Sequence, residues 1–216
     1  MKSKQTIDTF ECFSIKTHGK ILKESLILFN ESGFNTVTTS IISKQCDILE
    51  GTLWYHFNSK KKILFTHIDF FEKLFNERTK NVDFKYLNNI FAVSFDIYSL
   101  IWDFQYIFRE HFEFFSNDKE LLKRVEKINV FIDNYIKNLI LQSQKHFINF
   151  EQSNLDTLVD STLMMGRYWL HFAKKRYKKL NDKELKKKGI MILMDYYRQF
   201  LHDKAFEDLS NFLKRY

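Results

Sequence analysis

The amino-acid sequence predicts an all-α protein. Its 216 residues include no Pro and only five Gly, whereas strand-rich folds need many turns and place Gly and Pro in them. Apolar residues recur at intervals of three and four along most of the chain, which is the spacing of one face of a helix. The chain is 44% hydrophobic and contains 24 Phe and 10 Tyr, which is enough apolar bulk to fill a core. This length suits one large domain, or a small domain followed by a medium one.

The first helix is predicted to end at Gly33, because Gly commonly follows the last turn of a helix in the left-handed conformation. Its apolar stripe consists of Ile21, Leu22, Ser25, Leu26 and Phe29. Either Thr38 or Thr39 can cap a second, short helix through its hydroxyl. The apolar side of this second helix is formed by Ile41 and Ile42.

A third short helix is predicted over about residues 50–56, after a turn at Asp47. Asn58 or Ser59 can cap a fourth helix. The apolar positions of this fourth helix are Ile63, Leu64, Ile68, Phe71 and Phe75. Three short helices therefore precede the first long one.

Long helices are predicted for the remainder of the chain, with no repeat and no Ser- or Gly-rich linker between them. The apolar spacing places these helices at roughly 84–103, 118–147, from Ser153 or Asn154 to about Lys174, from Asp182 to about His202, and in a short tail to Tyr216. A kinked aromatic segment is expected over 104–115. The element boundaries carry a tolerance of a few residues.

The positive charge of the chain is concentrated in one run. The net charge is +7. Residues 173–188 carry nine basic and two acidic groups, a local net of +7, whereas residues 1–62 carry nine and six, a net of +3. This run is either a solvated linker or a surface for nucleic acid, membrane headgroups or an acidic partner.

The sequence indicates a cytoplasmic protein without cofactor or metal. It has no charge-free apolar stretch of about 18 residues that would predict a transmembrane helix, and no apolar N-terminal run typical of a signal peptide. Cys12 and Cys46 lie far apart and fit no metal spacing, so we expect two reduced thiols. The HExxH, Gly-rich phosphate-loop and G-x-S-x-G patterns of enzymes are missing from the sequence.

The second and third helices, joined by a tight turn, form a helix-turn-helix arrangement. In such a pair the second helix enters the major groove of DNA. Leu53 and Phe57 are spaced i, i+4 and predict its buried side, while Gly51 would let the backbone approach a phosphate. The expected DNA-binding residues are Thr38, Thr39, Glu50, Gly51, Thr52, Trp54, Tyr55, His56 and Lys60.

Residues 19–64 resemble the DNA-binding domain of the TetR family of bacterial transcriptional regulators. The shared pattern is an Ile-Leu pair opening the first helix, Leu-Phe at its end, a Gly-aromatic pair and a Thr/Ser cluster. It closes with GTLWYHFNSK over residues 51–60. The resemblance implies a ligand-responsive regulator, by default a repressor, that binds double-stranded DNA at a near-palindromic operator as a homodimer. It implies a DNA-binding domain over 1–62 and a helical effector-binding and dimerisation domain over 63–216.

Four residues depart from the pattern of that family. Asp47 stands in place of the usual turn Gly, and Leu49 replaces a Ser cap, which removes about 1 kcal/mol of stabilisation. Lys61 replaces a Glu that would favour a helix N-terminus. Trp54 stands where Tyr is usual, so a phosphate contact would come from its indole N–H.

The larger domain is expected to hold a small effector, apolar or aromatic, among its central helices. Candidate ligand-binding residues combine apolar bulk with polar groups: Trp102, Tyr106, Arg109, His111, Tyr135 and Trp169. The last two long helices are predicted to form a four-helix bundle with their symmetry mates. The proposed dimer residues are Leu155, Leu158, Val159, Thr162, Gly166, Ile192, Leu193, Tyr196, Tyr197 and Phe200.

Two alternatives to a DNA-binding regulator remain open at the level of sequence. The first is a non-enzymatic helical module that docks an anionic membrane or an acidic partner through residues 173–188. The second is a helical enzyme with its site among the central helices, which would require a polar cluster there.

Overall fold

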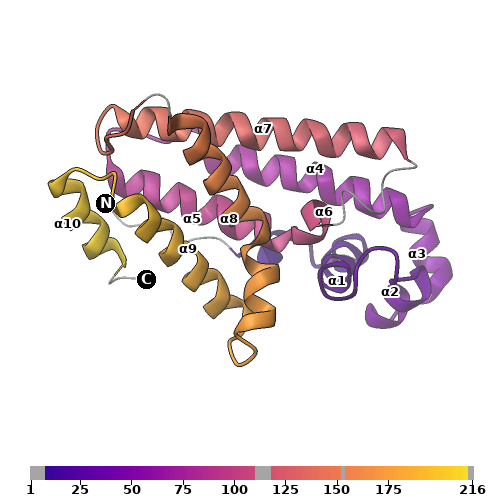
Figure 1. The fold of residues 1–216 in the computed structure, drawn as a ribbon. Helices are drawn as coiled ribbons and strands as arrows, with labels where there is room; N and C mark the ends of the chain where they lie inside the picture. The colour runs from indigo at the N-terminus through magenta and orange to yellow at the C-terminus, as the bar shows by residue number, and fades with distance from the viewer. Residues whose placement is uncertain (1–7, 110–117, 152–153, 214–216) are drawn as a thin grey trace. The chain divides into compact units, whose positions relative to one another are not determined.

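The computed structural model describes residues 8–109, 118–151 and 154–213, and the regular structure of these residues is helical (Figure 1). A short 3-10 helix, η1 (Thr9–Cys12), precedes the α-helices. These are α1 (Thr17–Ser32), α2 (Thr39–Gln45), α3 (Glu50–His56), α4 (Lys60–Thr79), α5 (Leu87–Asp103), α6 (Gln105–Arg109), α7 (Lys119–Gln144), α8 (Leu155–Arg176), α9 (Asp182–Arg198) and α10 (Asp203–Leu213). The all-α prediction is confirmed.

The predicted long helices correspond to α5, α7, α8, α9 and α10. The kinked segment expected over 104–115 begins as α6, and residues 110–117 lie outside the described part of the chain. Asn154 occupies the N-cap of α8 without a side-chain hydrogen bond, and Ser153 is not among the described residues.

The chain forms two compact units that alternate along the sequence. The first unit comprises residues 1–75 and 103–125, and the second comprises 76–102 and 126–216. Helix α4 runs without interruption from Lys60 to Thr79, past the boundary expected at residue 62. That boundary is a functional division, and it stays a prediction.

Local chemistry explains the short helices of the first unit. Gly33 adopts a φ of 83° and donates its N–H to the Phe29 carbonyl at 3.0 Å, which ends α1. The Thr38 hydroxyl caps α2 by accepting the Ile41 N–H at 3.2 Å. Asp47 takes the left-handed conformation, with a φ of 52°, at the turn between α2 and α3. Leu49 leaves the N-terminus of α3 without a side-chain cap, as predicted.

A buried histidine joins three helices of the first unit. His67 of α4 lies 2.8 Å from the Tyr106 hydroxyl through Nδ1 and 2.9 Å from the Leu22 carbonyl oxygen through Nε2. Burial lowers the pKa of His67 to about 4, so the ring is neutral. Because a carbonyl oxygen only accepts, Nε2 carries the proton and Nδ1 accepts from Tyr106. This ring therefore holds α6 and α1 to α4.

In the second unit, α8 and α9 pack against each other and are joined by a short turn (Figure 1). Asn181 and Glu184 form a capping box at the start of α9, with N–H to side-chain distances of 3.0 and 2.8 Å. Gly189 of α9 faces the indole rings of Trp169 and Trp102. This close approach explains why α9 has no side chain at that position.

The structure buries the predicted dimer residues of α8 within the protomer. Leu155, Leu158, Val159 and Thr162 are buried inside the protomer, and Gly166 is covered by the Tyr98 ring. The 3.6-residue period identified an apolar face correctly, but that face packs on α5 and α9 of the same chain. On α9, Leu193 is also buried, Ile192 is exposed, and Tyr196 and Tyr197 are half-buried. Phe200, which follows the end of α9, is half-buried as well.

Candidate nucleic-acid interface

Helix α3 has one buried side and one exposed side. Leu53 and Phe57 are buried in the first unit, as their i, i+4 spacing predicts. On the other side, Tyr55 is 86% exposed and Trp54 is 44% exposed. Glu50 and Gly51 are exposed as well, while Thr52 and His56 are half-buried. The exposed side presents aromatic rings with hydrogen-bonding groups, which can donate to phosphates or base edges.

Helices α2 and α3 are tied together by their own polar residues. The Thr39 hydroxyl donates to the Glu50 carboxylate at 2.6 Å. Thr38 is engaged as the cap of α2. All three were predicted to contact DNA, and the structure gives each an intramolecular hydrogen bond that sets the geometry of the helix pair.

The end of α3 is held by stacked rings. His18 of α1 stacks on Phe57, with ring centroids 4.6 Å apart and an interplanar angle of 25°. His56 meets both His18 and Tyr55 edge-on, at centroid distances of 6.2 and 5.3 Å. Burial, and secondarily the charge of His56, lowers the pKa of His18. These ring contacts fix the C-terminal end of α3, next to the exposed Tyr55.

The three lysines at the start of α4 have different partners. The Lys60 ammonium donates to the Phe34 and Val37 carbonyls at 2.7 and 2.8 Å, so it holds the loop between α1 and α2. Lys61 pairs with Asp118 at 2.7 Å. The phosphate contact predicted for Lys60 stays a prediction, and in this structure its ammonium donates to backbone carbonyls.

Two exposed lysines of the first unit lie outside the set of predicted DNA-binding residues. Lys62 is exposed on α4, and Lys44 is exposed in the last turn of α2. A helical projection of the sequence places both lysines away from the apolar stripes of their helices. Their position on the polar face is therefore a sequence signal that could have identified them. Exposed lysines are able to neutralise phosphates, and the affinity of proteins for DNA depends strongly on such contacts.

The predicted ligand-binding residues are dispersed in the structure. Tyr106 is buried against His67 in the first unit, and Trp102 donates its indole N–H to the Gly166 carbonyl at 2.5 Å in the second unit. Trp169 and Tyr135 are half-buried. The Arg109 side chain and His111 lie outside the described part.

The second unit contains a cavity of about 50 Å³ between α5, α7, α8 and α9. None of the described residues predicted to bind the ligand lines it. The lining consists of ten apolar residues and five hydroxyl-bearing ones: Leu87, Ile90, Phe91, Ser94, Tyr98, Ile136, Leu139, Ile140, Ser143, Ile148, Thr162, Leu193, Met194, Tyr197 and Leu201. Sequence spacing favoured large aromatic residues with polar groups, whereas the helices enclose mainly aliphatic ones.

Among the described residues, neither a candidate metal-ion site nor a membrane-spanning helix is found. Within residues 8–109, 118–151 and 154–213, no group of three or more His, Cys, Asp or Glu is placed to hold a metal ion. Burial raises the pKa of the Cys46 thiol to about 11, which opposes a reactive thiolate. In the same part of the chain, no helix is long and apolar enough to cross a bilayer.

Two family models match most of the chain. Residues 21–66 match the model described as "bacterial regulatory proteins, tetR family". Residues 71–209 match a second TetR model, described as "bacterial transcriptional repressor". Together these matches span both the helix-turn-helix and the unit that contains the cavity.

Similar proteins of known sequence match over part of the chain. The icaADBC biofilm-operon negative regulator IcaR of Staphylococcus aureus is 33% identical over 75 residues, which cover 35% of this chain and 34% of that regulator. The transcriptional regulator YerO of Bacillus subtilis is 30% identical over 64 residues, 30% of this chain and 22% of that protein. The aligned part therefore spans about a third or less of these relatives.

Solved structures share the fold over nearly the whole chain. A TetR-family regulator from Marinobacter aquaeolei is similar with a TM-score of 0.76 and 20% identity, covering 93% of this chain and 98% of that one. AibR, solved in complex with isovaleryl coenzyme A and operator DNA, is similar with a TM-score of 0.62 and 17% identity, covering 82% and 98%. At these identities the comparison establishes the fold alone.

Proposed function

Since the chain belongs to the TetR family of bacterial transcriptional regulators, we propose that it binds a near-palindromic DNA operator as a homodimer, and that a small effector alters this binding. The observation that carries the proposal is the exposed face of α3. Tyr55 and Trp54 project from a helix whose other side is fixed by Leu53 and Phe57. A rigid helix with one exposed polar-aromatic face fits the major groove, while Lys62 and Lys44 meet the backbone.

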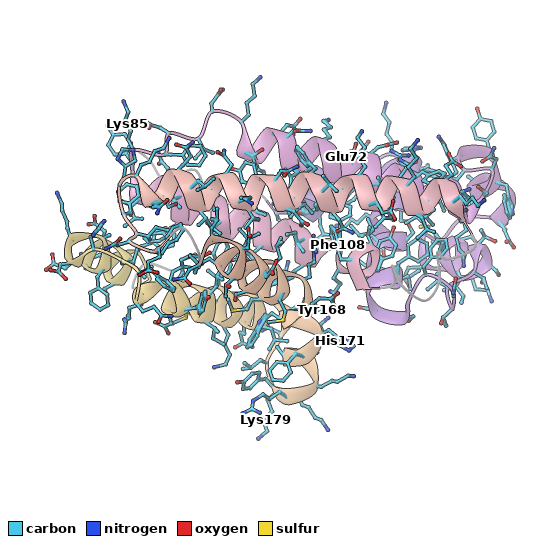
Figure 2. All side chains as sticks on the ribbon, turned by 45° about the horizontal axis from the view of Figure 1, so that its top comes forward. Glu72, Lys85, Phe108, Tyr168, His171 and Lys179 are labelled. Carbon is cyan, nitrogen blue, oxygen red and sulfur yellow. The ribbon has the colours of Figure 1, made fainter. Side chains whose placement is uncertain are left out.

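Dimerisation is proposed through the outward face of α8. Met164, Tyr168 and Phe172 follow one another at i, i+4 and i+8 and are 62%, 45% and 53% exposed. Figure 2 shows Tyr168 and His171 along the second half of α8, with Lys179 at the turn that follows. On α9, Met191 and Ile192 are also exposed, at 40% and 37%. We propose that these exposed residues pack on the same residues of a second copy about a two-fold axis, which would form a four-helix bundle.

The effector is proposed to occupy the cavity of the second unit. A ligand that binds one arrangement of these helices better than another shifts the population of the dimer between them. Recognition helices must lie about 34–36 Å apart to enter successive major grooves, so a change of a few ångströms weakens binding. By default the protein represses in the absence of ligand, in line with the repressor description of the matching family. Its proposed place of action is the cytoplasm.

The basic run 173–188 does not support the alternative of a membrane or acidic partner. Lys174 pairs with Asp182 at 2.9 Å, and Lys188 lies over the Tyr177 ring. These are the local pairings of a solvated helical hairpin. The proposal of a DNA-binding regulator rests on the family match and on α3, and uses none of this charge.

Selection of bound sequences from random double-stranded DNA tests the proposed function. The proposal predicts a near-palindromic consensus whose half-sites are about one helical turn apart. Binding to it should weaken steeply as salt rises, because lysine–phosphate contacts release counterions. Enrichment of no sequence, or of a single asymmetric site bound by one chain, would overturn the proposal.

A further inference from the structure

We propose that the cavity of the second unit takes an uncharged, mainly aliphatic molecule bearing a hydroxyl or carbonyl oxygen, and that this molecule enters by separating α5 from α8 and α9. The inference rests on the proposed function, because it specifies the effector of that regulator. It is carried by three observations: the chemistry of the lining, the size of the cavity and the hydrogen bonds that close it.

The lining favours a neutral ligand. Among the described residues around the cavity, none carries a charge, and the polar groups are the hydroxyls of Ser94, Ser143, Thr162, Tyr98 and Tyr197. A carboxylate or an ammonium buried there would lose its hydration without gaining an opposite charge. Hydroxyl groups instead suit one oxygen on an otherwise apolar molecule.

A cation that acts on the cavity lining, Arg167, is paired through its terminal nitrogen with a carboxylate. Arg167 influences Tyr98 electrostatically, but its guanidinium contacts the Asp133 carboxylate at 2.6 Å. An anionic ligand would have to compete with this internal ion pair. Burial also raises the pKa values of Tyr98 and Tyr197, so both remain neutral hydroxyls that can donate and accept.

The cavity is too small for an effector in the present conformation. Its volume of about 50 Å³ is a third of the ~150 Å³ that admits benzene in an engineered protein cavity. A ligand of eight or more carbon atoms must therefore widen it. Of the four helices that contribute to the lining, α5 is the one we propose to move away from α8 and α9.

A hydrogen-bonded cluster holds the walls of the cavity together. The Tyr98 hydroxyl of α5 donates to the Thr162 carbonyl of α8 at 2.7 Å, and the Thr162 hydroxyl lies 2.5 Å from the Tyr197 hydroxyl of α9. All three residues line the cavity. A ligand oxygen placed among them can replace the bonds that are broken when the walls separate. This exchange gives the polar end of the ligand a defined position.

Three probes of equal chain length test the charge preference: 1-octanol, octanoate and octylammonium, titrated into the full-length protein at pH 7.5 by calorimetry. The proposal predicts saturable binding of 1-octanol, at least tenfold tighter than binding of either ion. It is overturned if 1-octanol does not bind, or if octanoate or octylammonium binds as tightly.

A pair of variants tests the location. Ser94→Leu places a branched side chain in the cavity and should weaken 1-octanol binding at least tenfold. Ser161→Leu is the matched control, because Ser161 is half-buried on α8 beside Thr162 but is not part of the lining. Equal loss in both variants, or none in Ser94→Leu, would place the site elsewhere. If Ser94→Leu does not fold, the comparison of the three probes on the unaltered protein still decides the proposal.

Binding of the selected DNA is measured on the same samples, which separates this inference from the proposed function. A protein that binds DNA but not 1-octanol keeps the function and loses the ligand class. A protein that binds 1-octanol in the cavity but binds no DNA keeps the ligand class and loses the function.

Discussion

Gly189→Ala should destabilise the protein, although Ala normally stabilises a helix. Gly189 lies inside α9, where replacing Gly with Ala would ordinarily add about 0.5–1 kcal/mol. A methyl group there would overlap the indole of Trp169 and lie 2.6 Å from Cη2 of Trp102. Neither ring can move freely, since each donates its N–H to a backbone carbonyl: Trp169 to Leu185 and Trp102 to Gly166.

The magnitude follows from the balance of these two effects. Forcing an extra methyl group into a packed site costs about 1–3 kcal/mol. After subtraction of the helical gain, Gly189→Ala should lose about 1 kcal/mol of unfolding free energy, and at most about 2.5 kcal/mol. Gly51→Ala is the matched control, because a methyl group at Gly51 of α3 would meet no atom within 4 Å. That variant should gain about 0.5–1 kcal/mol.

Urea unfolding followed by tryptophan fluorescence measures both variants. Two of the three Trp residues are the rings that Gly189 faces, so the signal reports on the site itself. The prediction is a lower urea midpoint for Gly189→Ala and a higher one for Gly51→Ala, with unchanged slopes. A Gly189→Ala midpoint at or above that of the unaltered protein would refute the packing of α9 against the two indoles.

Three further predictions concern the first unit. Leu49→Ser supplies the missing cap of α3 and should raise the unfolding free energy by about 1 kcal/mol, seen as a higher melting temperature; an unchanged or lower one would contradict it. Asp47→Gly relieves the left-handed φ of 52° and should gain about 0.5 kcal/mol in urea unfolding after the entropy of the unfolded chain is counted; a loss would show that Asp47 contributes more than a turn. The pKa of His67 is lowered from 6.5 to about 4 in the folded protein. Its neutral ring therefore contributes fully to the unfolding free energy above pH 6.5. This contribution, up to about 3 kcal/mol, is lost as the pH falls towards 4. Urea midpoints measured from pH 7.5 to 4.5 should fall accordingly and fall less in His67→Gln, whereas equal profiles would contradict the assignment.

The sequence predicted the N-terminal unit in most of its detail because its signals are local. A Gly after an apolar stripe, a Thr before a short helix and an i, i+4 apolar pair each depend on neighbours within a few residues. Gly33, Thr38, and the pair Leu53 and Phe57 therefore occupy their predicted roles. The absence of a side-chain cap at Leu49, the N-cap of α3, was also predicted.

The cavity and the outward face of α8 could not be predicted in the same way, because both depend on packing between distant segments. Periodicity shows that α8 has an apolar face but not whether that face packs within the protomer or on another copy. Leu158 and Thr162 face inward, whereas Tyr168 is exposed. Likewise Tyr106 combines an aromatic ring with a hydroxyl, as ligand-binding residues often do, yet its hydroxyl is hydrogen-bonded to His67 in the core.

The central claim is that the exposed face of α3 contacts DNA. Its most direct test is the affinity of Tyr55→Ala for the selected operator, measured beside Tyr86→Ala, whose tyrosine is 62% exposed ahead of α5 in the second unit. The account predicts at least a tenfold loss of affinity for Tyr55→Ala and less than a twofold change for Tyr86→Ala. Equal affinities of the two variants would contradict it.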